Sequence, residues 1–585
     1  MSNAAGKPKP TFFIAVLAVV AGLIGLAAWR CNSKSATKEG QVTGTIDPNL
    51  VKKPAANAED PSGGDFTTAK TYEFVEGEKM KPVEGAADYK AIGPKRVVKF
   101  AINVWAGWAP IIYANGGKGP GKVWKAGLDK DGKPGADFQV ELQLIDDPSK
   151  MTAAFASGDL HIGWATVDML PLIAQRLNRD PRTMPRVFQQ VDWSNGGDGI
   201  IARDNIKSIS DLKGKTVVLA QNSPSHYFLL STLLSSGVQP KDVNMKFTQD
   251  AFQAALAFKQ DSSISAAVSW APDIYTIPEK VPGTKTLLTT GTANKMIGDV
   301  WFARADFARD YPDIVEGLVR GIFDAMVDVK DEAKKAEAAT LMDKLYDLPP
   351  GSGKDMWADA HSTNFYESRD FLLNQNNPTN FENTYETAYQ LYDAIRVVDT
   401  RTRFDQILDI AAVKALYDRL ATEEKYAKQT NEYQFNFTPT SAGAIDAESA
   451  VITKTVVIKF FPNSFDLKKK VSPPGGGAEV PYDPTVDATI KEIAQLSAQY
   501  GAARIQIEGH TDASKRGEAD ESLVRELSLN RANAVKQELV NQFKLAPNQF
   551  VVAGLGWDRP ADPRDPNNHA KNRRVEIKVI PAEAQ

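Results

Sequence analysis

The segment IQIEGHTD, residues 505–512, decides the fold of the C-terminal part of the chain. Its alternating apolar and polar residues predict a β-strand that runs directly into a Gly-His-Thr-Asp turn. A helix follows, in which a spacing of four residues puts Arg531 in line with Leu527, Val535 and Leu539. A guanidinium on that apolar face needs a carboxylate partner, because an unpaired buried charge strongly destabilises a protein.

Asp512, at the mouth of the predicted strand, is the complementary half of such a pair. Two interpretations remain open. Asp512 and Arg531 pair with each other and fix the loop, or together they hold a zwitterion, with its carboxylate on Arg531 and its ammonium on Asp512. The second is the chemistry of an amino-acid head group, such as the diaminopimelate centre of a cell-wall peptide.

Three motifs follow one another here: GHTD at 509–512, LSLNRA at 527–532 and NRRVEI at 572–577. In this order they resemble the OmpA-like peptidoglycan-binding domain, which also occurs in flagellar stator proteins of the MotB type. The resemblance covers about 450–582 and implies an α+β domain with a mixed sheet. It also implies a ligand pair, Asp512 and Arg531, and near neighbours of that pair, which are His510, Thr511 and Asn530. The loops 513–526 and 468–482 look longer than is usual in the family.

The middle of the chain alternates between predicted strands and helices from Arg96 onward. This order predicts an α/β fold with mostly parallel sheets, in two lobes that cross over within 189–203. The predicted strands are 97–104, 138–145, 160–164, 216–220, 243–247 and 264–269. Helices are predicted from Asp147, Ser225 and Asp250, and after Pro272.

A second ordered series of motifs runs through this region: WAGWAP at 105–110, ASGD at 156–159, GWAT at 163–166, DLKGK at 211–215, SWAPD at 269–273 and FARADF at 302–307. The series resembles periplasmic substrate-binding proteins of the taurine, alkanesulfonate and nitrate type, which serve ABC transporters. The resemblance implies a two-lobed clamp over 95–435 that closes on a solute.

The carboxyl ends of strands line the binding crevice in open parallel sheets. Here those ends carry aromatic and small polar residues, from which we predict a pocket for a small flat or anionic solute. The alternative is that the tryptophans pack in the cores and that the histidine bonds the backbone. The residues concerned are Trp105, Trp108, Trp164, Asn222, Ser223, His226 and Trp270.

The N-terminal residues 11–29 form a run of nineteen residues without a charge, long enough to span a bilayer. A cleaved signal peptide is the alternative, and lipidation of Cys31 is disfavoured because Trp29 and Arg30 precede it. We predict a cytoplasmic tail at 1–10, a single uncleaved span in the inner membrane, and the bulk of the chain in the periplasm of a Gram-negative envelope. Residues 30–94 and 436–449 are predicted to be a flexible tether and a linker, before a final domain at 450–585.

The composition excludes several classes of function. A net charge of −4 over 585 residues argues against a nucleic-acid partner. A single cysteine excludes intrachain disulfides, and the five histidines lack metal-ligand spacing. No phosphate loop or Gly-x-Ser-x-Gly motif is present, so we expect no enzyme, no cofactor and no metal.

The sequence therefore predicts a membrane-anchored periplasmic solute-binding protein tied to peptidoglycan. The alternative is an accessory or stator-like subunit of an envelope motor or channel complex, in which the binding-protein domain is a scaffold. The membrane run carries no ionisable residue that could move a proton. Homodimerisation through the C-terminal domain follows by family analogy only.

Overall fold

The computed structural model of the protein describes residues 66–77, 79, 82–435, 437, 450–473 and 476–581. These lie in one compact unit that spans Asp65–Gln585. The predicted anchor at 11–29 and most of the predicted linker lie outside the described residues. Within the described ranges, no helix has both the length and the apolar character needed to cross a bilayer.

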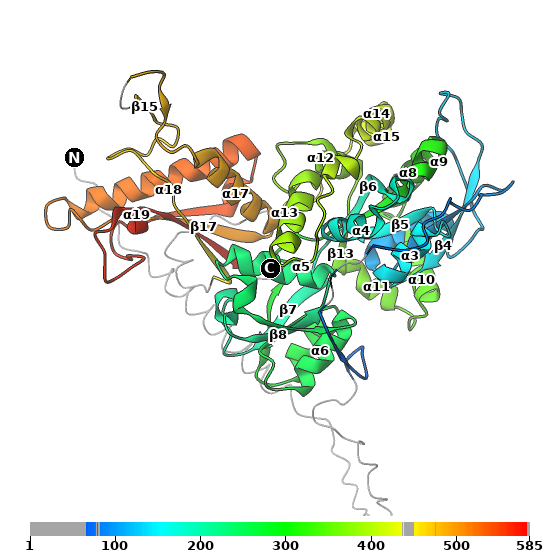
Figure 1. Cartoon of the computed structure of the whole chain (residues 1–585), viewed down its shortest axis with the longest axis horizontal. Coiled ribbons are helices and arrows are strands. Elements are labelled where there is room, and N and C mark those ends of the chain that lie inside the picture. The colour runs from blue at the N-terminus through cyan, green and yellow to red at the C-terminus, as the bar shows by residue number, and fades with distance from the viewer. Residues whose placement is uncertain are drawn as a thin grey trace, which may run out of the picture. The chain divides into compact units, whose positions relative to one another are not determined.

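The first lobe is built on a seven-stranded sheet with the order β13-β6-β12-β5-β2-β4-β3 (Figure 1). β2 is parallel to β4 and β5, whereas β12 is antiparallel to β5 and β6, so the sheet is mixed and not mostly parallel. The strands are β2 (Val97–Ile102), β3 (Val123–Trp124), β4 (Phe138–Leu144), β5 (Ile162–Thr166), β6 (Pro185–Ser194), β12 (Gly298–Arg304) and β13 (Ala360–Ser362).

Helices from two parts of the chain complete this lobe. They are α2 (Ala109–Asn115), α3 (Pro148–Ala156), α4 (Leu170–Leu177), α8 (Ala305–Asp310), α9 (Pro312–Asp328), α10 (Glu332–Tyr346), α11 (Ser352–Met356), α12 (Phe365–Leu373), α13 (Phe381–Ala394), α14 (Ile410–Leu420) and α15 (Glu424–Ala427). As predicted, Asp147 begins α3, where its carboxylate accepts the backbone N–H groups of Ser149 and Lys150.

The second lobe is built on a six-stranded sheet with the order β1-β9-β8-β10-β7-β11. Its elements are β1 (Phe74–Val75), β7 (Asp198–Arg203), β8 (Thr216–Ala220), α5 (Pro224–Ser235), β9 (Asn244–Thr248), α6 (Ala251–Gln260), β10 (Ala266–Trp270), α7 (Asp273–Lys280) and β11 (Thr284–Thr289). The chain passes between the lobes at 195–197, inside the predicted crossover, and again at 290–297, which the sequence patterns did not indicate.

The segment 66–94 is not a free tether, contrary to the prediction. β1 pairs with β9 at the edge of the second lobe, and the Thr68 hydroxyl donates a 2.8 Å hydrogen bond to Asp273. On the first lobe, the Val83 N–H donates to the carbonyl of Arg176 over 2.8 Å. The polar composition of this segment concealed backbone hydrogen bonds, which any sequence can make.

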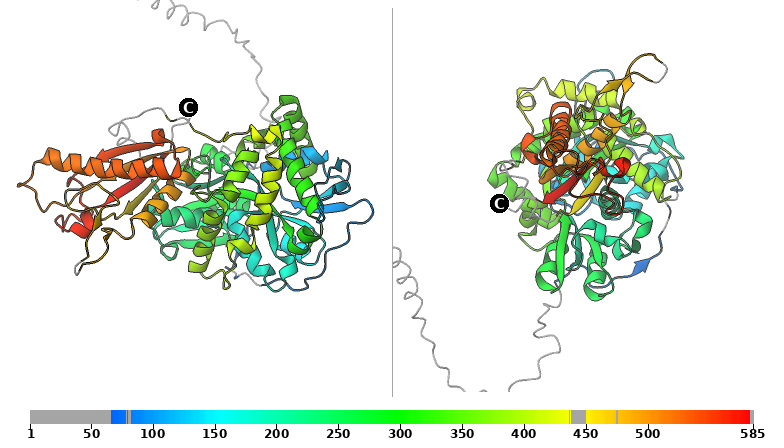
Figure 2. Two further views of the ribbon diagram at one scale, coloured as in Figure 1. Left: turned by 90° about the horizontal axis from the view of Figure 1, so that it is seen from above. Right: turned by 90° about the vertical axis from the view of Figure 1, so that its left-hand side faces the viewer.

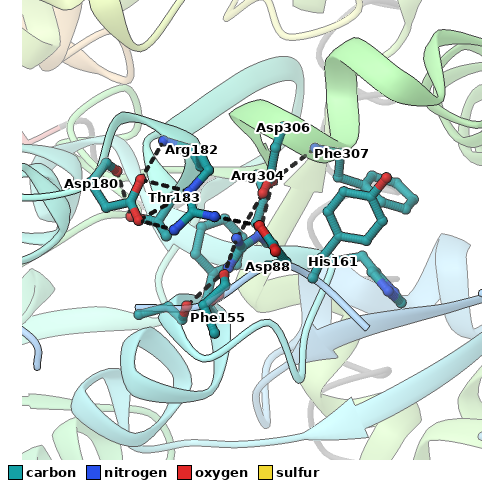
Figure 3. Close-up of polar contacts among 12 residues, drawn as sticks. Asp88, Phe155, His161, Asp180, Arg182, Thr183, Arg304, Asp306 and Phe307 are labelled. Carbon is teal, nitrogen blue, oxygen red and sulfur yellow. Dashed lines mark hydrogen bonds and ion pairs between the residues drawn. The ribbon is translucent and has the colours of Figure 1, made fainter. Parts of the chain in front are cut away.

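Arg304, at the end of β12, shows how this fold accommodates a buried arginine (Figure 3). Its guanidinium is fully buried and donates two hydrogen bonds, of 3.0 and 2.8 Å, to the carboxylate of Asp306. It also donates to the carbonyls of Phe155, Ala156 and Ala87, and the last of these holds the N-terminal segment on the lobe. A counter-ion and several acceptors together compensate for the lost hydration.

The C-terminal domain has a four-stranded sheet with the order β14-β19-β17-β18, in which β17 and β18 are parallel and the other pairs are antiparallel. This mixed sheet was predicted. Helix α18 packs across β17 and β18 (Figure 1, Figure 2). The elements are β14 (Ile452–Val456), β15 (Lys470–Val471), β16 (Val480–Pro481), α17 (Val486–Gln499), β17 (Ala503–Gly509), α18 (Glu521–Phe543), β18 (Phe550–Gly554), α19 (His569–Asn572) and β19 (Val575–Pro581).

Two details of this domain differ from the sequence interpretation or extend it. The strand predicted from Asn572 begins at Val575, because 569–572 form the short helix α19. The lengthened loop 468–482 carries a two-stranded ribbon made by β15 and β16.

Candidate functional site

Two glycines bring helix α18 close to the ends of β17 and β18. A Cβ atom on Gly509 would collide with the backbone oxygen of Ser528, and one on Gly554 would collide with the backbone oxygen of Arg525. Only glycine allows this close packing of backbone on backbone. The GHTD turn therefore begins with a glycine for a structural reason, and the residues that follow lie beside the middle of α18.

Arg531 lies on the inward face of α18, as its spacing predicted, and is 4% exposed. Its Nε donates a 3.1 Å hydrogen bond to the carbonyl of Ser464, and its guanidinium lies 4.9 Å from the centre of the Phe460 ring. Among the described residues, no carboxylate oxygen lies within 4.0 Å of this guanidinium. Burial and the nearby Arg573 lower the pKa of Arg531 to about 10, although Asp512 opposes the change. Unlike Arg304, this buried arginine has no counter-ion in direct contact within the described part of the chain.

Asp512 is held by groups other than Arg531. Its Oδ2 is ion-paired with Arg573 and lies 3.1 Å from Nδ1 of His569, and its Oδ1 accepts the N–H of Ser514 at 3.1 Å. Burial raises the pKa of Asp512, but the hydrogen bonds from Ser514, Arg573 and His569 outweigh it and hold the pKa well below its usual range. The mutual pair considered from the sequence is therefore not formed, and cations outnumber carboxylates at this site.

The predicted neighbours of the pair separate into two groups. Thr511 is buried, donates its N–H to the carbonyl of Gly556 over 2.7 Å, and has no hydrogen-bond partner for Oγ1 among the described residues. Asn530 is half-buried on α18. His510, in contrast, is directed toward Glu508 and Glu576, and its Nε2 lies 3.8 Å from a carboxylate oxygen of each.

The three side chains of His510, Glu508 and Glu576 could hold a metal ion, since their ligand atoms lie within 4.8 Å of one another. Burial lowers the pKa of His510 to about 4, so its imidazole is neutral. Lys578 donates to Glu508 over 2.6 Å and Arg574 to Glu576 over 2.7 Å, so both carboxylates already have counter-ions. Sequence spacing could not reveal this cluster because Glu508 and Glu576 face each other across two strands.

Two of the predicted solute-binding tryptophans lie where the chain crosses between the lobes. Trp105 follows β2, and its Nε1 donates a 3.1 Å hydrogen bond to Oδ2 of Asp192 on β6. Trp270 ends β10 and is the Cα partner of Asp198, the first residue of β7. Both indoles are partly exposed.

Two other tryptophans are placed as packing residues. Trp108 is fully buried near Phe100, and its Nε1 donates to Asn103 over 2.7 Å. Trp164 is buried, and its Nε1 donates to the carbonyl of Ile145 over 3.0 Å.

The polar residues predicted for the pocket lie at the start of α5. The Ser223 hydroxyl donates to the carbonyl of Ala220 over 2.9 Å. Nδ1 of His226 accepts the N–H of Asn222 at 3.2 Å, and burial lowers the pKa of His226 to about 4. The alternative considered from the sequence, in which His226 forms a hydrogen bond with the backbone, therefore holds for its Nδ1 atom.

Four buried carboxyl groups that no sequence pattern indicated lie at the crossing between the lobes: Asp168, Asp192, Asp198 and Asp299. Burial raises the pKa of the first three to about 7. Burial and the neighbouring Asp192 and Asp198 raise the pKa of Asp299 well above its usual value. Nothing in the sequence around these aspartates predicts that they lie together. The register of the sheet brings Asp299 opposite Asp192.

Comparison with known proteins supports both resemblances drawn from the motifs. Residues 476–574 match the model of the OmpA family, and 135–345 match the family described as "ABC transporter, phosphonate, periplasmic substrate-binding protein". The taurine-binding periplasmic protein of Escherichia coli (strain K12) is 27% identical over 186 residues, 32% of this chain and 56% of that protein. The outer membrane protein Omp38 of Acinetobacter baumannii is 38% identical over 87 residues, 15% of this chain and 23% of that protein.

The chain thus spans about half the length of the first relative and about a quarter of the second. Among solved structures, the periplasmic aliphatic sulphonate binding protein SsuA of Escherichia coli is 17% identical, with 55% of this chain and 99% of that chain covered at a TM-score of 0.40. The chain therefore combines a segment similar to periplasmic solute-binding proteins with a C-terminal OmpA-like segment.

Proposed function

We propose that the protein is a periplasmic solute-binding protein held to peptidoglycan by its C-terminal domain. The family matches support both halves, and the uncompensated guanidinium of Arg531 carries the wall-binding half. A carboxylate of the peptide stem, such as that of a diaminopimelate centre, would supply the counter-ion that Arg531 lacks. Two guanidinium groups, of Arg531 and Arg573, lie near the one carboxylate of Asp512, and this excess of positive charge favours the same ligand.

The rest of the proposal concerns location and assembly. A single pass through the inner membrane at 11–29 would leave the binding domain in the periplasm, between membrane and wall. Non-enzymatic solute capture by closure of the two lobes, and dimerisation through the C-terminal domain, are further parts of the proposal.

Co-sedimentation with purified sacculi tests the wall-binding half. The full chain, in detergent, should sediment with sacculi, and Arg531→Met should remain in the supernatant. The matched control is Arg525→Met, which removes an exposed arginine of the same helix that pairs with Glu521 and Asp558. Equal sedimentation of Arg531→Met and the wild type would refute wall binding through this residue.

A further inference from the structure

The acidic cluster at the lobe crossing consists of Asp168, Asp192, Asp198 and Asp299, of which none is more than 4% exposed. On the first-lobe sheet, Asp299 of β12 is the Cα partner of both Asp192 on β6 and Thr166 on β5. Asp168 follows β5 directly, and Asp198 opens β7 just after the chain has crossed. Four carboxyl groups from both lobes are thus gathered at the hinge, where a clamp of this type would hold its solute.

The acidic cluster has no counter-ion within the ranges that the structure describes. Among the described residues, no lysine, arginine or histidine nitrogen lies within 4.0 Å of any of its four carboxyl groups. The other ionisable groups that interact with the cluster are acidic or phenolic: Asp359, Tyr227, Tyr275, Tyr346, Tyr392 and Tyr433. Enclosed carboxylates without a cation are costly, so such groups either hold protons, in line with the raised pKa values of these four, or meet a cationic ligand.

Buried carboxylates elsewhere in the same chain do have cationic partners. Asp306 is paired with Arg304, Asp313 with Arg96, and Glu316 with Arg419. Asp483 is also buried, and it accepts hydrogen bonds from the Lys459 N–H and from the N–H and hydroxyl of Thr485. The acidic cluster differs from these four residues because it has carboxyl oxygens with neither kind of partner in the described part of the chain.

The acidic cluster also has unused acceptors. Both oxygens of Asp168 and Oδ1 of Asp192 and Asp198 are buried without a hydrogen-bond donor in the described part of the chain. The remaining oxygens of the last two accept from neutral groups: Asp192 from the Trp105 indole, and Asp198 from the Ser194 hydroxyl over 2.7 Å. Acceptors of this kind are available to hydrogen-bond donors of a bound molecule.

Aromatic rings lie beside the acidic cluster. The Trp105 ring lies so close to Gly197 that a side chain at that position would collide with it, and Trp270 is the strand partner of Asp198. Tyr275 is exposed, and its hydroxyl donates to the carbonyl of Gly196 over 2.8 Å. Carboxylates combined with aromatic faces are the chemistry that recognises ammonium and quaternary ammonium groups. An anionic solute would add a like charge to a site that offers acceptors.

We propose that the acidic cluster binds an organic cation, a small amine or quaternary ammonium compound, whose charge lies against Asp192, Asp198 and Asp299 between Trp105 and Trp270. This inference rests on the proposed solute-binding function and replaces the anionic solute expected from the sequence. The aromatic rings favour an organic cation over a bare metal ion. Calcium and magnesium ions bind oxygen ligands and gain nothing from an aromatic face, whereas an ammonium group binds to both.

Calorimetry with the full chain at pH 8 tests the inference. The probes are choline and putrescine, the neutral isostere 3,3-dimethylbutanol, the sulfonates taurine and ethanesulfonate, and calcium and magnesium chloride. We expect choline or putrescine to bind, and the neutral isostere to bind at least about 30-fold more weakly, as is typical when a buried charge pair is lost. Asp198→Asn should weaken binding of the cation by a similar factor. The control Asp204→Asn, at an exposed turn residue that directly follows the same strand, should change it less than about twofold.

Each other outcome overturns the inference. Binding of the sulfonates alone would leave the proposed solute-binding function intact and refute the cationic class. Binding of calcium or magnesium alone would also refute an organic cation. No binding by any probe would refute both the inference and the solute-binding function. If Asp198→Asn fails to fold, Asp192→Asn provides the same comparison, since its carboxyl group contacts the Trp105 indole.

Discussion

Replacing Arg531 with methionine should separate stability from wall binding. Burial lowers the pKa of this arginine to about 10, which corresponds to about 3 kcal/mol of unfavourable free energy for the charged form. Methionine removes that cost. It also loses the hydrogen bond to Ser464, worth about 1 kcal/mol, and the contact with the Phe460 ring, worth about 1 kcal/mol. The net expectation is a variant that is as stable as the wild type or more stable by about 1 kcal/mol.

Urea unfolding of the full chain, followed by circular dichroism, measures the free energy of unfolding. Sedimentation with sacculi measures binding to the wall. The account predicts an unchanged or raised unfolding midpoint together with loss of sedimentation. Arg525→Met controls for loss of a charge on the same helix. A variant destabilised by about 3 kcal/mol or more, the cost of breaking a satisfied buried pair, would show that Arg531 serves structure and not a ligand.

Three further variants test the physical argument. Arg304→Met should lower the free energy of unfolding by about 3–5 kcal/mol in urea titrations, because it leaves Asp306 buried without a counter-ion; a loss below about 1 kcal/mol would contradict this reading. Gly509→Ala should destabilise by about 1–3 kcal/mol and weaken sedimentation with sacculi, since its Cβ would push Ser528 and α18 away; full retention of both properties would be the contrary result. Asp198 has a folded pKa raised to about 7, so its protonated form contributes stability that is fully present below about pH 4 and is lost as the pH rises through 7. Asp198→Asn should therefore flatten the decline in melting temperature of the ligand-free chain between pH 5 and 8, and an unchanged slope would count against the buried acid.

Six strands of the binding domain were predicted because they are short apolar runs between capped helices. Asp250 illustrates this, since it begins α6 by accepting the N–H of Gln253, as the pattern indicated. The strands β6, β7, β11 and β12 were not predicted, and they pair antiparallel in sheets that were expected to be mostly parallel. The burial of Arg531 was predictable because the spacing of four residues puts it in line with the apolar residues of α18. The position of the segment 66–94 could not be predicted from the sequence. Its strand β1 joins the second lobe through backbone hydrogen bonds, which do not depend on amino-acid composition.

The partners of the site residues depended on contacts between distant parts of the chain. Asp512 is bound by Arg573 and His569, about sixty residues further on, and no local pattern links them. The acidic cluster required the register of β12 between β5 and β6, which brings Asp299 beside Asp192. Sequence periodicity predicts which face of an element is buried, but not which element lies against it.

Retention of a labelled solute on sacculi tests the central claim most directly, since it requires both halves of the chain at once. Sacculi coated with the wild-type chain should retain labelled choline or putrescine in the pellet. Arg531→Met should leave both chain and label in the supernatant, whereas Asp198→Asn should sediment without label. Label and Arg531→Met chain sedimenting together at the wild-type level would contradict the account.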